Sequence, residues 1–223
     1  MRYRRTDLVD RAVEVLDEVG VDALSMRHLA AEVGVQPSAL YHHFANKQAL
    51  LNAVADRILE LGRRGTEIVT WESELRLICA ELRDAMTTHR DGAVLISRVH
   101  ALGGGAQEPE RRMRDALLRA GADGDLARVG ARTLVLFVFG HVGREQARAS
   151  AAGGDGRDGE KAGGKPGESA GGSPQEAAEQ ADFAVGLGLV LDGLAGAVER
   201  GAAQRSPLGI VDETSERHGG DHG

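Results

Sequence analysis

Between Gly143 and Asp182 the sequence contains no Val, Ile, Leu, Met, Phe, Trp or Tyr. A segment of this kind buries too little apolar surface to offset the entropy that is lost when its backbone becomes ordered. We therefore predict a flexible loop over about 150–175, between a helical region and a helix over 175–200. The polar tail over 201–223 is expected to fray.

Elsewhere the apolar side chains recur at helical spacing, which predicts an all-α fold with about nine or ten helices. The first helix is expected to follow Thr6 as its N-cap residue. Two short helices are expected over 25–32 and 37–44, and a longer helix follows the N-cap residue Asn46. The one strand-like run lies inside the longer apolar segment 125–149, and its length favours a buried helix.

A glycine at position 34 separates the two short helices, which is the pattern of a helix-turn-helix. Leu29 and Ala30 give the first helix an apolar inner face, and Leu40 and Phe44 are expected to anchor the second. The side chains left outside suit base edges, thymine methyl groups and phosphates: Gln36, Pro37, Ser38, Tyr41, His42 and His43. A three-helix packing unit without a role in DNA binding is the alternative interpretation.

The distribution of charge favours DNA binding more than the total charge does. The chain has 34 Asp and Glu against 27 Lys and Arg, which gives a formal net charge of −7. Yet no acidic residue occurs over 33–55, so this segment can approach phosphates without repulsion. Lys47 stands in a first helical turn, where its ammonium group joins free backbone N–H groups. Further basic residues precede the first helix or begin the second: Arg2, Arg4, Arg5 and Arg27.

Composition excludes several other classes of protein. The single cysteine, Cys79, excludes a disulfide framework and a cysteine zinc site. No apolar run approaches the roughly 18 residues of a membrane span. The segment Met1–Asp7 lacks the apolar region of a signal peptide. We therefore expect a cytoplasmic protein with no metal, no cofactor and no membrane partner.

The segments Leu24–Val35 and Ala39–Leu51 resemble the DNA-binding domain of the TetR family of repressors. We accordingly expect a DNA-binding domain over 1–47 and a regulatory and dimerisation domain over 48–200. The resemblance implies a homodimer on palindromic operator DNA, and a small-molecule inducer that moves the fourth helix and releases the DNA. Carried over by position, the DNA contacts are Met26, Arg27, Pro37, Ser38, Ala39, Tyr41, His42 and Lys47.

The second half of the chain resembles the tetracycline repressor subgroup at Thr88–Ala93 and Phe183–Leu194. In that subgroup a metal-binding histidine follows the first segment by three residues, where this chain has Ile96. An aliphatic side chain cannot ligate the hard magnesium ion of a metal–drug chelate, so we do not expect magnesium–tetracycline as inducer. The residues proposed to line a ligand pocket are Leu82, Met86, Ile96, His100, Met113, Phe137, His141 and Glu145.

Two alternatives to a ligand-responsive repressor follow from the residues. The nearer one is a constitutive DNA-binding dimer, or an activator, without a small-molecule inducer. The remote one is an enzyme that uses His141 and Glu145, which lie four residues apart on one helix face. We predict no enzyme, because no nucleophile–base pair, phosphate loop or three-ligand metal set accompanies this pair.

The helices over 125–149 and 175–200 are expected to pair with the same helices of a second copy in a four-helix interface. Small residues such as Gly188 and Gly193 lower helix propensity but permit close approach of helices. On this hypothesis a charged substitution at Leu191 should yield monomers.

Overall fold

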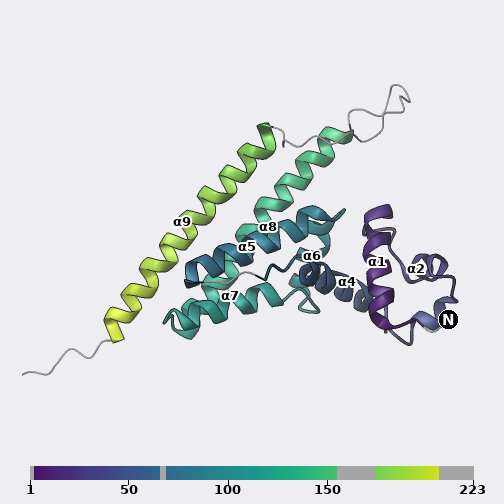
Figure 1. Cartoon of the computed structure of the whole chain (residues 1–223), viewed down its shortest axis with the longest axis horizontal. Coiled ribbons are helices and arrows are strands. Elements are labelled where there is room, and N and C mark those ends of the chain that lie inside the picture. Colours follow the sequence, from purple (N-terminus) through teal and green to yellow (C-terminus); the bar gives the residue numbers. More distant parts are fainter. Residues whose placement is uncertain (1–2, 66–68, 155–173, 206–223) are drawn as a thin grey trace, which may run out of the picture.

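The computed structural model describes residues 3–65, 69–154 and 174–205, and within these ranges all regular structure is helical. This confirms the predicted all-α class. The helices of the described residues are α1 (Arg5–Val19), α2 (Met26–Glu32), α3 (Pro37–Leu40), α4 (Lys47–Leu61), α5 (Trp71–Thr88), α6 (Gly92–Ala101), α7 (Glu108–Arg119), α8 (Gly124–Gly154) and α9 (Pro174–Arg205). Figure 1 shows α1 and α2 at one end, α5–α7 in the middle, and α8 and α9 as two long neighbouring helices.

Helix α1 begins slightly earlier than predicted. Its N-cap residue is Arg4, and Thr6 lies inside the first turn. The carboxylate of Asp7 accepts the backbone N–H of Arg4 at 3.1 Å, so the start of the helix is capped by Asp7 and not by Thr6. The helix ends at Gly20, whose φ of +83° is the conformation that favours glycine.

Helix α3 is shorter than the predicted helix over 37–44. It ends at Leu40, and the following residues form a turn in which Phe44 N–H donates to the Leu40 carbonyl at 2.9 Å. This turn brings the Phe44 ring into the core, where 1% of its surface is exposed. Tyr41 and His42 therefore belong to the turn rather than to the helix.

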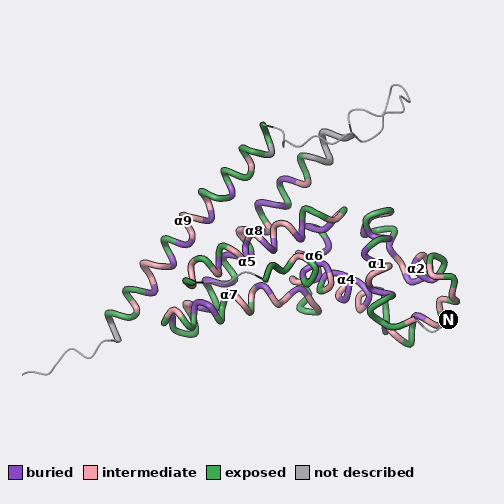
Figure 2. The backbone as a smooth tube through the Cα atoms, viewed as in Figure 1, coloured by how far each residue is buried: buried purple, intermediate pink, exposed green. Residues whose placement is uncertain are grey.

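Helix α4 connects the two halves of the molecule. It starts at the predicted N-cap Asn46, whose Oδ1 accepts the N–H of Ala49 at 2.9 Å. The helix contacts α1 on one side and both α5 and α6 on the other. Figure 2 shows buried positions in α1, α4 and α6, and these residues belong to one apolar core that the two halves share.

Helices α8 and α9 extend further than the sequence analysis predicted. The last turn of α8 covers part of the expected loop and reaches Gly154, while α9 continues past the expected tail boundary to Arg205. Alanines at 151–152 and 202–203 account for both extensions, because alanine is the strongest helix former. The remainder of the predicted loop, 155–173, and of the tail, 206–223, lies outside the described residues, as does Arg2.

By length and composition alone, α8 and α9 also contain segments apolar enough to cross a membrane. These are Gly124–Arg148 and Ala177–Ala203, with mean hydropathies of 1.3 and 1.6. Ala and Gly, between Leu and Val residues, raise the mean hydropathy without forming one continuous apolar run. Core helices pass the same test, and α8 packs against α5, α6, α7 and α9.

Candidate DNA-binding face and regulatory core

The turn between α2 and α3 has the geometry of a helix-turn-helix. Ser25 caps α2 by accepting the His28 N–H at 3.2 Å. Gly34 adopts a φ of +67°, and the next N–H, that of Val35, donates to the Ala30 carbonyl at 2.9 Å. These bonds close a tight turn that directs α3 away from α2. The buried side chains of Leu29 and Leu40 then hold the two helices together.

Most of the side chains assigned to DNA contact lie on the outside of this unit. Gln36, Ser38 and His42 are exposed, and 56% of the Tyr41 surface is exposed. Met26 differs, because only 6% of its surface is exposed and its side chain packs in the core. The other positions of the set are exposed at Arg27 and Lys47 and half-buried at Pro37, Ala39 and His43.

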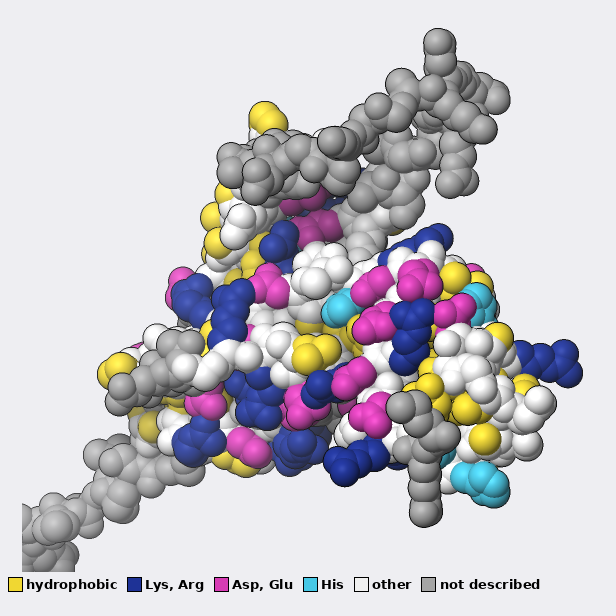
Figure 3. Space-filling model, turned by 45° about the vertical axis from the view of Figure 1, so that its right-hand side comes forward, with side chains coloured by type: hydrophobic (Ala, Val, Ile, Leu, Met, Phe, Trp, Pro, Cys, Tyr) yellow, Lys and Arg dark blue, Asp and Glu magenta, His cyan; other side chains and the backbone are white. Residues whose placement is uncertain are grey.

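Lys47 occupies the first position of α4, next to the capping residue Asn46. Its Nζ atom lies 3.3 Å from the Asp22 carbonyl oxygen, which orients the side chain while leaving it exposed. An ammonium group at a helix N-terminus is suited to hold a phosphate. Figure 3 shows basic and histidine side chains projecting from this right-hand end of the molecule, whereas acidic side chains gather nearer the middle.

The end of α1 is docked on the turn between α5 and α6. Nδ1 of His89 lies 2.9 Å from Asp17, which also accepts the backbone N–H of Arg90 at 3.0 Å. On the other side of the turn, Asp91 accepts the backbone N–H of Val21 at 3.0 Å. Sequence reasoning did not identify this junction, because its partners are about 70 positions apart in the chain.

The same turn is also tied to α8. The side-chain amide of Gln146 donates to the Met86 carbonyl at 2.8 Å and accepts the N–H of Ala93 at 3.3 Å. Gln146 therefore bridges the end of α5 and the start of α6. The turn between α5 and α6 is therefore hydrogen-bonded to both α1 and α8.

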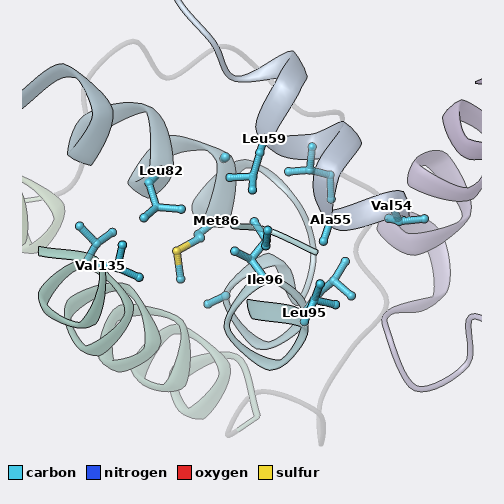
Figure 4. Close-up of a cluster of buried hydrophobic side chains, with 14 of the residues drawn as sticks. Val54, Ala55, Leu59, Leu82, Met86, Leu95, Ile96 and Val135 are labelled. Atoms are coloured by element: carbon cyan, nitrogen blue, oxygen red, sulfur yellow. The ribbon is translucent and has the colours of Figure 1, made fainter. Parts of the chain in front are cut away.

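Four of the proposed pocket residues lie deep in the regulatory core. Leu82, Met86, Ile96 and Met113 each have at most 1% of their surface exposed. Figure 4 shows Leu82, Met86 and Ile96 directed toward one another, with Val135 of α8 facing them. This centre is lined by aliphatic and thioether groups, and it offers nothing at Ile96 to coordinate a hard metal ion.

His100 makes its contacts on the side of α6 that faces α7 and α8. Its Nε2 atom lies 2.8 Å from Glu110, and its ring meets Phe139 edge-on with centroids 5.3 Å apart. Glu110 in turn lies 3.5 Å from the Nε of Arg132. His100 thus belongs to a polar contact that joins α6, α7 and α8.

Phe137, His141 and Glu145 form a separate group where α8 meets α5 and α9. Nε2 of His141 lies 3.1 Å from Glu145 and 3.1 Å from the Glu179 carbonyl oxygen. Glu145 also accepts from the guanidinium group of Arg83 at 2.9 Å. The proposed pocket residues therefore lie in three separate places rather than around one cavity.

The sequence analysis did not identify Arg83 as a partner of Glu145, because no spacing in the sequence links the two residues.

A cavity of about 900 Å³ lies between α1, α4 and the segment that joins α6 to α7. The joining segment approaches α4 through Gly104, where a Cβ atom would lie 2.3 Å from the Asn52 side chain. Asp56 fixes the same segment by accepting the Ala106 N–H at 2.7 Å.

Among the described residues, no cluster of three or more His, Cys, Asp or Glu side chains is arranged to hold a metal ion.

Comparisons with known proteins agree with this geometry. Residues 8–54 match the family described as bacterial regulatory proteins, tetR family, and residues 65–198 match the tetracyclin repressor-like C-terminal domain. The class A tetracycline repressor protein from transposon 1721 of Escherichia coli is 38% identical over 198 residues, covering 84% of this chain and 88% of the relative.

Two solved structures are similar to most of the chain. A crystal structure of BioQ with its double-stranded DNA operator has a TM-score of 0.65 and 34% identity, covering 87% of this chain and 99% of that chain. A crystal structure of TetR-Q116A from Acinetobacter baumannii AYE with minocycline has a TM-score of 0.68 and 26% identity, covering 88% and 99%. The fold is thus found in one protein bound to DNA and in another bound to a small molecule.

Proposed function

Because this chain belongs to the TetR family of bacterial regulatory proteins, we propose that it is a cytoplasmic, ligand-responsive transcriptional repressor. It binds palindromic operator DNA as a homodimer and is released by a small-molecule inducer. The observation that carries this proposal is the exposed, acid-free face of α3 and the turn that follows it. The relatives are regulators rather than enzymes, which argues against catalysis by His141 and Glu145.

DNA recognition is assigned to two sets of side chains with different roles. Ser38 and His42 offer hydrogen-bonding groups that can read base edges in the major groove. Lys47 contacts a phosphate and fixes the position of α3 without reading sequence. The assignment of Met26 cannot involve its side chain, since that side chain is buried.

A dimer is supported by the apolar surface of α8 and α9. Exposed fractions reach 59% at Leu136 of α8 and 71% at Leu189 of α9. Large exposed apolar faces on neighbouring helices mark association surfaces, and a two-fold axis lets the same face meet itself. In such a dimer α8 and α9 form a four-helix interface.

The inducer binds the conformation with misplaced recognition helices more tightly than the conformation that binds DNA. Its effect on DNA binding is limited by that difference in affinity. The aliphatic surroundings of Ile96 support an inducer that binds without a magnesium chelate. Two connections join this core to α1. Gln146 is hydrogen-bonded to the turn between α5 and α6, which contacts the end of α1, and α4 packs directly on α1.

Selection of bound duplexes from a random DNA pool by the full chain tests the proposal. We expect one palindromic sequence to be enriched, and its binding to weaken when an inducer is added. Enrichment that no candidate ligand alters would favour a constitutive regulator instead. Absence of any enriched sequence would refute DNA recognition.

A further inference from the structure

The segment 3–5, which includes Arg5 as the first residue of α1, is attached on both sides of α3. The Tyr3 hydroxyl donates to the Val33 carbonyl oxygen at 3.0 Å, and Val33 is the C-cap residue of α2. Two residues later, the guanidinium carbon of Arg5 lies 5.1 Å from the centroid of the Phe44 ring. Because Val33 precedes α3 and Phe44 follows it, this segment lies alongside the recognition helix.

Both attachments are specific rather than incidental. The last carbonyl groups of a helix have no partner within the helix, and the Tyr3 hydroxyl supplies one at the end of α2. The Tyr3 ring is half-buried against the core at the same place. Arg5 stacks its cationic plane near an aromatic ring, an attraction that still leaves its N–H groups available.

Arg4 lies between these two attachments. Its side chain is exposed, whereas its backbone N–H is held by Asp7. Chain termini are usually mobile unless they are tied down, so the attachments at Tyr3 and Arg5 restrict where the Arg4 guanidinium group can reach. That restriction lowers the entropy lost when the group binds a partner.

On the basis of the proposed function, we propose that Tyr3 is a positioning residue that holds Arg4 against the minor groove beside the major groove occupied by α3. An arm that precedes a recognition unit can enter the adjacent minor groove, where an arginine senses the strong negative potential. The arm thereby extends the contacted DNA beyond the bases that α3 reads.

The test uses the full chain and the duplex that the wild-type protein selects from a random pool. We expect Arg4→Ala to weaken binding about tenfold, as for a lost hydrogen bond to a charged group, and to reduce the salt slope by about one per chain. Hydroxyl-radical protection should disappear from the flanking minor groove and remain at the centre. The matched control Arg114→Ala removes an exposed guanidinium group of α7 and should change neither measurement.

Tyr3→Phe keeps the ring and removes only the hydroxyl group. We expect it to weaken binding about threefold to tenfold, the range for one hydrogen bond. Combined with Arg4→Ala, it should add almost nothing, because both changes act through the same arm. The melting temperature should stay close to that of the wild type.

Three results would overturn the inference. They are unchanged affinity and protection in Arg4→Ala, additive losses in the double variant, or losses in Tyr3→Phe that follow a large fall in melting temperature. If the wild-type chain selects no sequence at all, the proposed function fails as well. Selection by the wild type together with an unaffected Arg4→Ala would overturn only the role of the arm.

Discussion

Nδ1 of His89 lies 2.9 Å from a carboxylate oxygen of Asp17, which joins the end of α1 to the turn between α5 and α6. The Asp17 carboxylate also accepts a backbone N–H from that turn, at Arg90. The DNA-binding helices and the regulatory core are therefore connected by polar contacts as well as by α4. Since α1 packs on α2 and α4, these contacts help to fix the orientation of α3.

Asp17→Asn removes the charge from this junction while keeping the size of the side chain. The carboxylate is 43% exposed, so solvent screening limits its contribution to about 1 kcal/mol. For a chain of this length the melting temperature should fall by about 2–4 °C, measured by circular dichroism. Asp115→Asn, an exposed change on α7, is the control and should melt with the wild type. Equal melting of both variants would show that the junction contributes nothing.

Lys47→Ala is expected to weaken binding to every duplex by about tenfold or more, because an ammonium–phosphate contact is lost. The slope of log affinity against log salt concentration should become shallower by about one per chain. Fluorescence anisotropy titrations at several salt concentrations measure both quantities. Arg114→Ala serves as the control here too, and a loss restricted to one DNA sequence would contradict the phosphate assignment.

The apolar face of α9 predicts where dimerisation can be disrupted. Leu191, which the sequence suggested, is 1% exposed within a single chain, so a charge there would disturb the chain's own core. Leu189 is 71% exposed, and we expect Leu189→Glu to give folded monomers in sedimentation velocity. Leu118→Glu on α7 provides a control at a 44% exposed site. A wild-type-like dimer for Leu189→Glu would place the interface elsewhere.

Burial raises the pKa of the Cys79 thiol to about 12. In the unfolded chain a thiol has a pKa of about 8.5. Above that pH the unfolded state releases a proton that the native state retains. The stability linked to this group is complete below that value and declines as pH rises toward the native pKa. Maleimide should label the folded protein slowly at pH 8 and quickly in denaturant. Rapid labelling of the native protein would contradict this burial.

Several features were predictable because they depend on neighbours in the sequence. The glycine turn at Gly34, the cap at Asn46 and the outward direction of Ser38 all follow from local chemistry. The buried state of Leu29 and Leu40 follows from apolar spacing in the same way.

Other features could not be predicted, because they depend on residues far apart in the chain. The contacts of Asp17 with His89 and of Tyr3 with Val33 form only after the helices pack. Periodicity also did not reveal that Met26 would be buried at the start of α2. Its exposure depends on how closely α2 approaches the rest of the core.

The central claim is that the face formed by α3 and the following turn recognises a specific DNA sequence. The most direct measurement is the ratio of affinities for the selected palindrome and for a scrambled duplex of equal length, at one physiological salt concentration. We expect the palindrome to bind at least about a thousandfold more tightly, as specific regulators do. A ratio near one would contradict sequence recognition by this face.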